Sequence, residues 1–260
     1  MKTSFPAKYA RTRKILAKKL KAYLKDSNPE NVRSLRIAIR RMSLGIELLP
    51  KKMRKQKATR TLAASLEQAS KANAKVRDLD IVISKISAYR AEASVDNQIA
   101  KIKETRESQL QTARRQTLTL RKQPVPKVGK KDLSNPKLQK RLNKTTNQLI
   151  SAINTRLPLV IQDSGNARDI HLLRMDCRRL RYLAELFRSK KTERLLSQLR
   201  SWQDLLGFIH DSDLSIDYLR NLEEASEMQP ILNDLVTQRS QSYEKFSSSA
   251  KPIPPANLVP

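Results

Sequence analysis

Two stretches decide the fold: NVRSLRIAIRRMSLGIELL at residues 31–49 and DIHLLRMDCRRLRYLAELF at residues 169–187. When the first is laid on the second so that Val32 meets Ile170, six apolar positions coincide. These positions alternate in steps of three and four, which predicts one buried face of an α-helix. The pairs are Val32 with Ile170, Leu35 with Leu173, Ile39 with Cys177, Met42 with Leu180, Ile46 with Ala184 and Leu49 with Phe187.

Basic residues accompany the apolar positions in both stretches, most of them one residue further along. One residue is about 100° around an α-helix, so we expect these side chains to border the core rather than point directly away from it. Two such placements favour a basic groove or channel over a freely solvated charged face. The residues are Arg33, Arg36, Arg40 and Arg41 in the first stretch, and His171, Arg174, Arg178, Arg179 and Arg181 in the second.

Each of these predicted helices is preceded by a second basic helix. Spacings of three and four place its cations on one face. Arginine suits bidentate contact with phosphate oxygens and lysine supplies a mobile point charge, so parallel rows of both would hold a chain of phosphates. The candidate residues are Lys14, Lys18 and Lys21 in the first half, and Lys137, Arg141 and Lys144 in the second.

The composition favours a polyanionic partner. The 260 residues include 53 Lys and Arg against 25 Asp and Glu, a formal charge of +28. Such an excess indicates nucleic acid, inorganic polyphosphate or anionic lipid headgroups as partner classes. Aromatic residues make up only 4% of the chain, which argues against stacking of single-stranded bases. Residues 1–60 carry 19 of the cations, so we expect the partner to lie against the early helices and their counterparts.

Helical periodicity and the presence of only 4 glycines predict an all-α chain. We expect helices over residues 4–25, 30–49, 52–74, from Asp78 onward, and over 95–122, 137–161, 166–188, 192–209, 212–227 and 230–248. The proline-rich stretch 123–136 separates a first repeat (1–122) from a second (137–248), and residues 249–260 form a mobile tail. The simplest assembly is two similar antiparallel helical bundles related by pseudo-two-fold symmetry, which would bring both basic rows to a shared central cleft.

A second match supports the repeat: Arg77-Asp78-Leu79-Asp80 corresponds to His210-Asp211-Ser212-Asp213. We call the shift that carries Arg77 onto His210 the motif offset. The aspartates could serve as metal ligands or as a general acid and base. We favour a structural role, in which they cap a helix or hold an arginine side chain in place. Two roles remain possible for His171: a neutral structural histidine or a hydrogen-bond donor to phosphate. We expect His210 to bond Asp211.

The scarcity of cysteine, histidine and glycine argues against several kinds of site. One cysteine, Cys177, and two histidines cannot build a structural zinc site or an internal disulfide. No Gly-rich phosphate loop, metal-ligand cluster or nucleophile–base pair is visible, so we expect no enzyme, no cofactor, no metal and no catalytic residue. No apolar stretch is long enough to span a bilayer, and we expect a cytoplasmic protein without membrane insertion.

Four motifs in this order resemble the CHAD family, the conserved-histidine α-helical domains: residues 32–42, 77–80, 171–182 and 205–213. The resemblance extends from about residue 5 to 248. It implies two four-helix bundles around a basic central pore that binds inorganic polyphosphate. It also places Arg36, Arg40, Arg41, His171, Arg174, Arg178, Arg179 and Arg181 on the family's basic motif positions. By the same resemblance the protein would be a binding module, which could associate with polyphosphate granules and also bind phosphate or sulfate ions.

The sequence departs from the family pattern at Arg33, which replaces the first histidine. A guanidinium keeps a donor and a permanent charge, but it cannot titrate near neutral pH as an imidazole does. The alternative function is RNA or DNA binding, which the charge alone would allow. A recognition helix, however, projects its arginines away from the core, whereas these border it.

Overall fold

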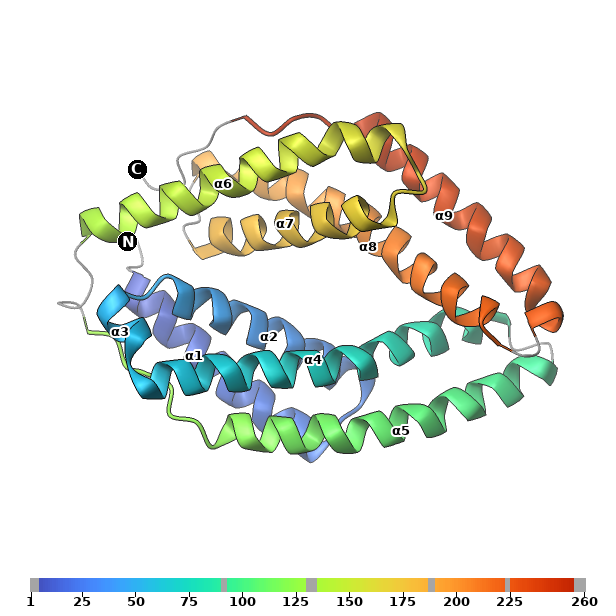
Figure 1. The fold of residues 1–260 in the computed structure, drawn as a ribbon, viewed down its shortest axis with the longest axis horizontal. Helices are drawn as coiled ribbons and strands as arrows, with labels where there is room; N and C mark the ends of the chain where they lie inside the picture. Colours follow the sequence, from blue (N-terminus) through green and yellow to red (C-terminus); the bar gives the residue numbers. More distant parts are fainter. Residues whose placement is uncertain (1–4, 90–92, 130–134, 187–189, 223–224, 255–260) are drawn as a thin grey trace. The chain divides into compact units, whose positions relative to one another are not determined.

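We describe the protein from a computed structural model, which places residues 5–89, 93–129, 135–186, 190–222 and 225–254. Nine α-helices, with two short 3-10 turns at Ser87–Tyr89 and Ala225–Met228, make up the regular structure of these residues (Figure 1). The all-α prediction is confirmed. The helices are α1 (Phe5–Lys25), α2 (Pro29–Glu47), α3 (Lys51–Lys55), α4 (Lys57–Ile86), α5 (Ala93–Arg121), α6 (Asn135–Gln162), α7 (Ala167–Leu186), α8 (Lys190–Arg220) and α9 (Gln229–Ser249).

The chain divides into two compact units. Unit 1 consists of Met1–Ile83 and Asn97–Leu138, and unit 2 consists of Ser84–Asp96 and Gln139–Pro260. The hairpin end between α4 and α5 therefore belongs to the second unit, although the first half of the sequence encodes it. Nothing in the apolar pattern of the sequence indicates this exchange.

The core of each unit follows the predicted apolar periodicity. On α2 and α7, five of the six aligned pairs are described in full, and every residue in them is buried. The motif offset also relates α1 to α6, because Tyr9 and Leu16 correspond to Leu142 and Leu149, all buried. Gly45 on α2 lies against the Tyr9 ring, which a Cβ at this position would meet at 3.2 Å. The two helices can approach this closely because residue 45 has no side chain.

The turn between α1 and α2 has the capping chemistry that its sequence predicts. The side chain of Asn28 accepts a hydrogen bond from the backbone N–H of Asn31 at 2.9 Å, and Pro29 occupies the first turn. Asn166 has the same role before α7, where it accepts from the N–H of Asp169 at 3.1 Å. Each cap satisfies one of the N–H groups that a helix start leaves without a partner.

Two predicted helix breaks are wrong. Helix α4 runs without interruption through Asp78, and α8 runs through Asp211, so these aspartates lie within helices rather than at helix starts. The buried side chains of α4 continue in steps of three and four from Leu62 to Asp80. Asp80 thus occupies a core-facing position, where its carboxylate interrupts the apolar pattern.

An arginine from α5 binds the buried carboxylate of Asp80. Arg106 Nε lies 2.6 Å from Asp80 Oδ1, and its Nη2 donates to the Ser27 carbonyl at 2.9 Å. One guanidinium thereby joins α5, α4 and the turn after α1. This agrees with the structural role expected for the aspartate.

The same three-part contact occurs in unit 2. Arg239 of α9 lies 2.7 Å from Asp213 of α8 and donates to the Ser164 carbonyl, in the turn after α6, at 2.6 Å. The motif offset carries Arg106 onto Arg239 and Asp80 onto Asp213, so the two contacts are equivalent in the repeat. We name these two sets the arginine clamps.

The end of the chain makes packing contacts within the segment, residues 249–260, for which the sequence predicts a mobile tail. Ile253 is 1% exposed, and its backbone N–H and carbonyl both bond the side-chain amide of Asn154, at 2.9 and 2.8 Å. The motif offset carries Leu120 onto Ile253, and Leu120 is also buried. The prolines on either side stop the helix but leave this apolar contact in place. Residues 255–260 lie outside the described residues.

The arginine clamps should differ in strength. Arg106→Ala would leave the Asp80 carboxylate, whose side chain is 1% exposed, buried without its partner, which should cost about 3–5 kcal/mol of unfolding free energy. Arg239→Ala should cost about 1–2 kcal/mol, because the Asp213 side chain is 26% exposed and water can replace the partner. Urea unfolding of both variants measures the difference. Equal losses would contradict the assigned role of burial, and Arg106→Met with Asp80→Leu should recover part of the stability.

The packed end of the chain gives a second prediction. Removing residues 251–260 should lower the free energy of unfolding by about 2–4 kcal/mol, because a buried isoleucine and three hydrogen bonds are lost, two with Asn154 and one from Gln198 to the Lys251 carbonyl. Removing only residues 255–260 is the matched control, which should change little. A thermal or urea unfolding transition that is the same for both truncations would show that Ile253 contributes no stability.

Candidate functional site

The basic row of α1 is exposed. Lys14, Lys18 and Lys21 lie on one face of the helix and all three side chains are in solvent. Lys19, on the neighbouring flank, donates to Ser34 Oγ of α2 at 3.1 Å and so ties α1 to α2. The three exposed cations are therefore available to a ligand on a helix whose position is fixed.

The arginines of α2 fall into three environments. Arg33 is exposed, with its side chain 3.7 Å from Glu30 in a pair that water screens. Arg40 and Arg41 are half-buried. Because consecutive residues are about 100° apart on an α-helix, Arg41 faces away from the flank that Arg33 and Arg40 share.

Arg36 is held inside unit 1. It is only 9% exposed, and its guanidinium donates to the carbonyl of Ser70 on α4 at 3.1 Å. Burial of a guanidinium requires such partners, since an unsatisfied charge in the interior is costly. Arg36 thus fixes α2 on α4 beneath the exposed cations.

The corresponding helices of the second half, α6 and α7, carry a similar set, and the first residues of α6, up to Leu138, are still part of unit 1. On α6, Lys137 and Lys144 are exposed and Arg141 is half-buried. On α7, Arg178 is half-buried and Arg179 is exposed. As with Arg41, Arg179 lies about 100° beyond its neighbour and leaves the flank of Arg178.

The two histidines of the chain meet in unit 2. The rings of His171 on α7 and His210 on α8 have centroids 5.3 Å apart and an interplanar angle of 53°. Next to them, Arg174 Nη2 lies 3.8 Å from Asp211 Oδ1, which joins the same two helices. The sequence analysis placed both histidines near arginine and aspartate but missed their contact, because they lie on different helices and only tertiary packing brings them together.

Lys85 is a cation that the sequence analysis did not select. It lies near the end of α4, in the segment that belongs to unit 2. Its Nζ is 3.5 Å from the centroid of the Phe208 ring and 3.4 Å from Ser212 Oγ, both on α8. Burial lowers the pKa of this lysine, an effect that Asp211 and Asp234 oppose. No spacing rule could have found Lys85, since its partners belong to the other half of the sequence.

Arg181 has its donors engaged within unit 2. Its Nε donates to Gln203 Oε1 at 2.6 Å and its Nη1 lies 2.6 Å from Glu185 Oε1. The side chain is 21% exposed. Arg181 thus holds α7 in place, as Arg36 does for α2.

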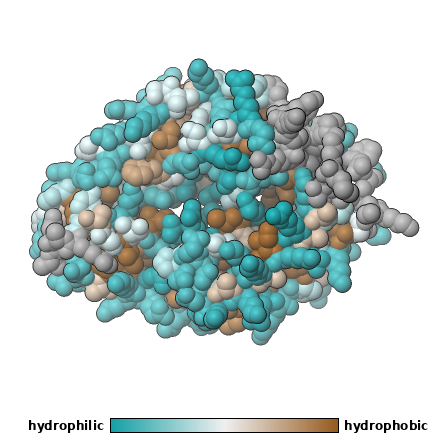
Figure 2. Space-filling model, turned by 180° about the vertical axis from the view of Figure 1, so that it is seen from behind, coloured by the Kyte–Doolittle hydropathy of each residue, from teal (hydrophilic) through white to brown (hydrophobic). Residues whose placement is uncertain are grey.

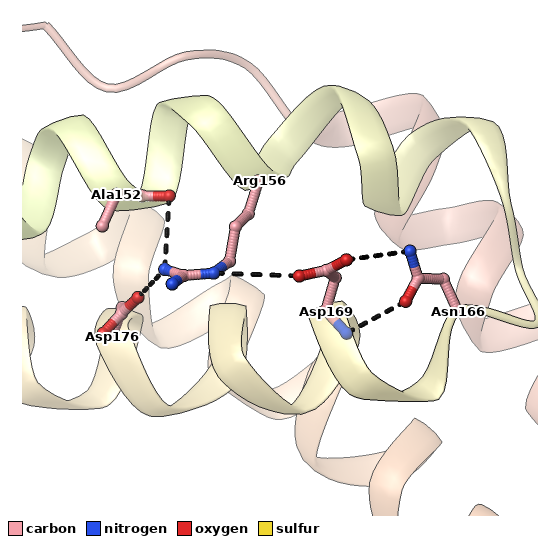
Figure 3. Close-up of polar contacts among 5 residues, drawn as sticks. All are labelled: Ala152, Arg156, Asn166, Asp169 and Asp176. Atoms are coloured by element: carbon pink, nitrogen blue, oxygen red, sulfur yellow. Dashed lines mark hydrogen bonds and ion pairs between the residues drawn. The ribbon is translucent and has the colours of Figure 1, made fainter.

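A network of charged side chains also holds α7 against α6 (Figure 3). Arg156 of α6 binds Asp176 and lies 3.9 Å from Asp169, and Asn166 Nδ2 donates to Asp169 at 3.0 Å. Burial raises the pKa of the Asp176 carboxyl, while Arg156 and Arg179 act in the opposite direction. The network sets the rotation of α7 and therefore the direction of its basic flank.

Among the described residues, no group of three or more His, Cys, Asp or Glu side chains is arranged to hold a metal ion. Cys177 is buried, and burial raises the pKa of its thiol, so the thiolate that would act as a nucleophile or ligand is disfavoured. In the placed part of the chain, none of the helices combines the length and apolar character needed to cross a membrane. Hydrophilic residues cover most of the face in Figure 2, with smaller separate hydrophobic areas.

The Asp176 network should affect how stability depends on pH. A carboxyl whose pKa is raised on folding binds more protons in the native state, so it stabilises the fold increasingly as pH falls toward the unfolded pKa. The unfolding free energy of the wild type, relative to Asp176→Asn, should therefore increase between pH 7 and pH 4 in a urea series. The exposed Asp217→Asn is the control and should show a smaller trend. A relative free energy that decreases with falling pH would mean that the arginines dominate.

Three comparisons place this arrangement among known proteins. A family model described as "CHAD domain" matches residues 9–220. A crystal structure of the CHAD domain from the plant Ricinus communis is similar with a TM-score of 0.65 and 18% sequence identity, over 95% of this chain and 91% of the other. No curated protein matches the sequence significantly. At this identity the structural likeness supports the fold alone.

Proposed function

The chain belongs to the CHAD domain family, whose general property is polyphosphate binding, and on this premise we propose that it binds inorganic polyphosphate without turning it over. One observation supports the proposal most directly. Each unit carries a basic flank beside its core, formed by α1 and α2 in unit 1 and by α6 and α7 in unit 2.

The exposed and half-buried basic residues of these helices would make the phosphate contacts. A polyphosphate carries about one negative charge per phosphate, so it attracts a row of lysines and accepts paired hydrogen bonds from arginine. We propose that Lys14, Lys18, Lys21, Arg33 and Arg40 act on α1 and α2. On α6 and α7 the proposed residues are Lys137, Arg141, Lys144, His171, Arg174 and Arg178. Arg41 and Arg179 would extend the surface to the far side of their helices.

Arg36 and Arg181 have a different part in the proposal. Their donors already bond Ser70, and Gln203 and Glu185, so they would act mainly by holding α2 and α7 in position. The arrangement of both flanks around one central pore stays a prediction of the family resemblance. The cytoplasmic location, which was inferred from the sequence itself, and the granule association also stay predictions.

Charge reversal tests the proposed surface. Lys14→Glu, Lys18→Glu and Arg33→Glu together should weaken binding of long-chain polyphosphate, because each exchange replaces an attraction by a repulsion. The slope of log affinity against log salt concentration should become less negative by roughly two to three. This takes the slope of about −0.9 per neutralised phosphate in DNA as a guide. Fluorescence anisotropy with labelled polyphosphate at several salt concentrations measures both effects.

The control has the same change in charge at a different place. Lys103→Glu, Arg115→Glu and Lys122→Glu affect exposed cations of α5 and the residue after it in unit 1. An equal loss in the two triple variants would mean that net charge alone holds the ligand. Equal affinity of the wild type for DNA or RNA of the same charge would favour the nucleic-acid alternative, and release of phosphate from polyphosphate would overturn the non-enzymatic assignment.

A further inference from the structure

The two histidines of the chain lie together on the basic flank of unit 2. His171 on α7 is exposed, His210 on α8 is half-buried, and their ring centroids are 5.3 Å apart. The sequence contains no other histidine. Histidine is the side chain whose charge ordinarily changes between about pH 5 and 8. All imidazole titration of the chain is therefore concentrated at one place, within the surface proposed to bind polyphosphate.

The internal repeat has arginines at the same two positions of unit 1. The alignment of the two basic stretches carries Arg33 onto His171, and the motif offset carries Arg77 onto His210. A guanidinium keeps its charge throughout the neutral range, whereas an imidazole loses its proton there. Unit 1 thus has permanent cations at both positions, and unit 2 has cations there only when its histidines are protonated.

The flank of α8 that carries His210 has open space beside it. Gly207 lies one turn before His210 and therefore on the same side of the helix. A Cβ at Gly207 would meet no neighbouring helix within 4 Å among the described residues. One turn earlier, Gln203 accepts a hydrogen bond from Arg181 of α7 at 2.6 Å. The boundary between α7 and α8 is thus closed at Gln203 and leaves room next to His210.

Unit 2 supplies charges of both signs, in the helices that carry the pair and in those packed beside them. The cations are Arg168, Arg174 and Arg178 on α7, Arg156 on α6, Lys85 at the end of α4 and Arg239 on α9, and the acidic groups are Asp169 on α7, Asp211 and Asp213 on α8 and Asp234 on α9. Each of these aspartates already interacts with one of these cations. Two imidazolium rings 5.3 Å apart would repel each other and the arginines, with little compensation from acidic neighbours. A polyanion beside the pair would supply that compensation.

We propose, on the basis of the proposed function, that polyphosphate binding to unit 2 is coupled to protonation of His171 and His210. The phosphate chain lies beside the two rings, and its negative charge offsets their mutual repulsion. Each protonated ring donates an N–H to a phosphate oxygen. His210, which was expected only to bond Asp211, is thereby a residue of the binding surface. Unit 2 binds polyphosphate more tightly as the pH falls, whereas the arginines of unit 1 bind independently of pH.

Proton uptake determines the direction of the pH dependence. An imidazole that the bound anion makes easier to protonate contributes affinity in full below the protonation midpoint of the ligand-free protein. This contribution is lost as the pH rises through the midpoint of the complex. Since an ordinary histidine titrates near about pH 6.5, the wild type should bind about tenfold more tightly at pH 6 than at pH 8. Fluorescence anisotropy with labelled long-chain polyphosphate at constant ionic strength measures the ratio.

Two double variants test the assignment to the histidines. His171→Gln with His210→Gln should bind at both pH values as the wild type does at pH 8, within about twofold, because neither amide takes up a proton. His171→Arg with His210→Arg copies the residues of unit 1 and should bind at both pH values as the wild type does at pH 6. The terminal phosphates of the ligand titrate equally in every sample. A tenfold ratio that persists in either variant would overturn the proposal.

Histidine-ring NMR tests the coupling on the wild-type chain, prepared without a histidine tag. Only two sets of ring C–H signals exist, and the single variants His171→Gln and His210→Gln assign them. Both protonation midpoints should move to higher pH when polyphosphate is present at saturation, because the anion stabilises the charged rings. Midpoints that stay in place would overturn the proposal, whatever the variants do.

The possible failures can be told apart. Wild-type binding that is equally tight at pH 6 and pH 8 would overturn the proton coupling and leave polyphosphate binding standing. Absence of binding at both pH values would overturn the proposed function and the coupling together. The triple variant Lys14→Glu, Lys18→Glu and Arg33→Glu should bind more weakly but keep the wild-type ratio, because its changes lie in unit 1. Loss of the ratio in this variant would overturn the assignment of the coupling to unit 2.

Discussion

The structure of both units depends on placing one guanidinium where three segments meet. The arginine clamps bring together the last helix of a unit, the adjacent long helix and the turn after the first helix. An aspartate at a core-facing position would be too costly without its arginine, and the arginine without the aspartate would leave a charge half-buried. Each clamp therefore requires its aspartate and its arginine together. Since the clamps fix the turns that precede α2 and α7, they also determine where the basic flanks begin.

The apolar period was sufficient to predict most of the helices, but it failed where a core position is polar. Asp80 continues the buried face of α4, but its carboxylate interrupts the apolar pattern, and a new helix was predicted to start two residues earlier, at Asp78. The compensating residue, Arg106, lies on the next helix, and a local pattern does not contain it. The motif offset, applied to the whole chain, would have linked Arg106 to Arg239 and Leu120 to Ile253. The internal comparison therefore holds information on tertiary contacts that helical periodicity lacks.

The site was predictable as a set of cations but not as a set of roles. Spacing correctly puts Lys14, Lys18 and Lys21 on one exposed face. It cannot distinguish Arg33, which is in solvent, from Arg36, which bonds a carbonyl of α4, because both occupy the same flank of α2. Whether an arginine is exposed or engaged depends on the neighbouring helix. For the same reason, the contact between His171 and His210 and the approach of Lys85 to α8 emerge only from the fold.

The assignment of residues 84–96 to unit 2 has a consequence for the order in which the protein can form. During synthesis, the first half leaves the ribosome with the end of its α4–α5 hairpin made but without the segments that cover it. Ile86 and Val95 are buried in the finished protein, and the rest of their unit starts only at Gln139. This apolar end must wait, exposed to solvent and to other nascent chains, until the second half has been translated. Because residues from both halves of the sequence form unit 2, neither half of the chain alone contains all of that unit.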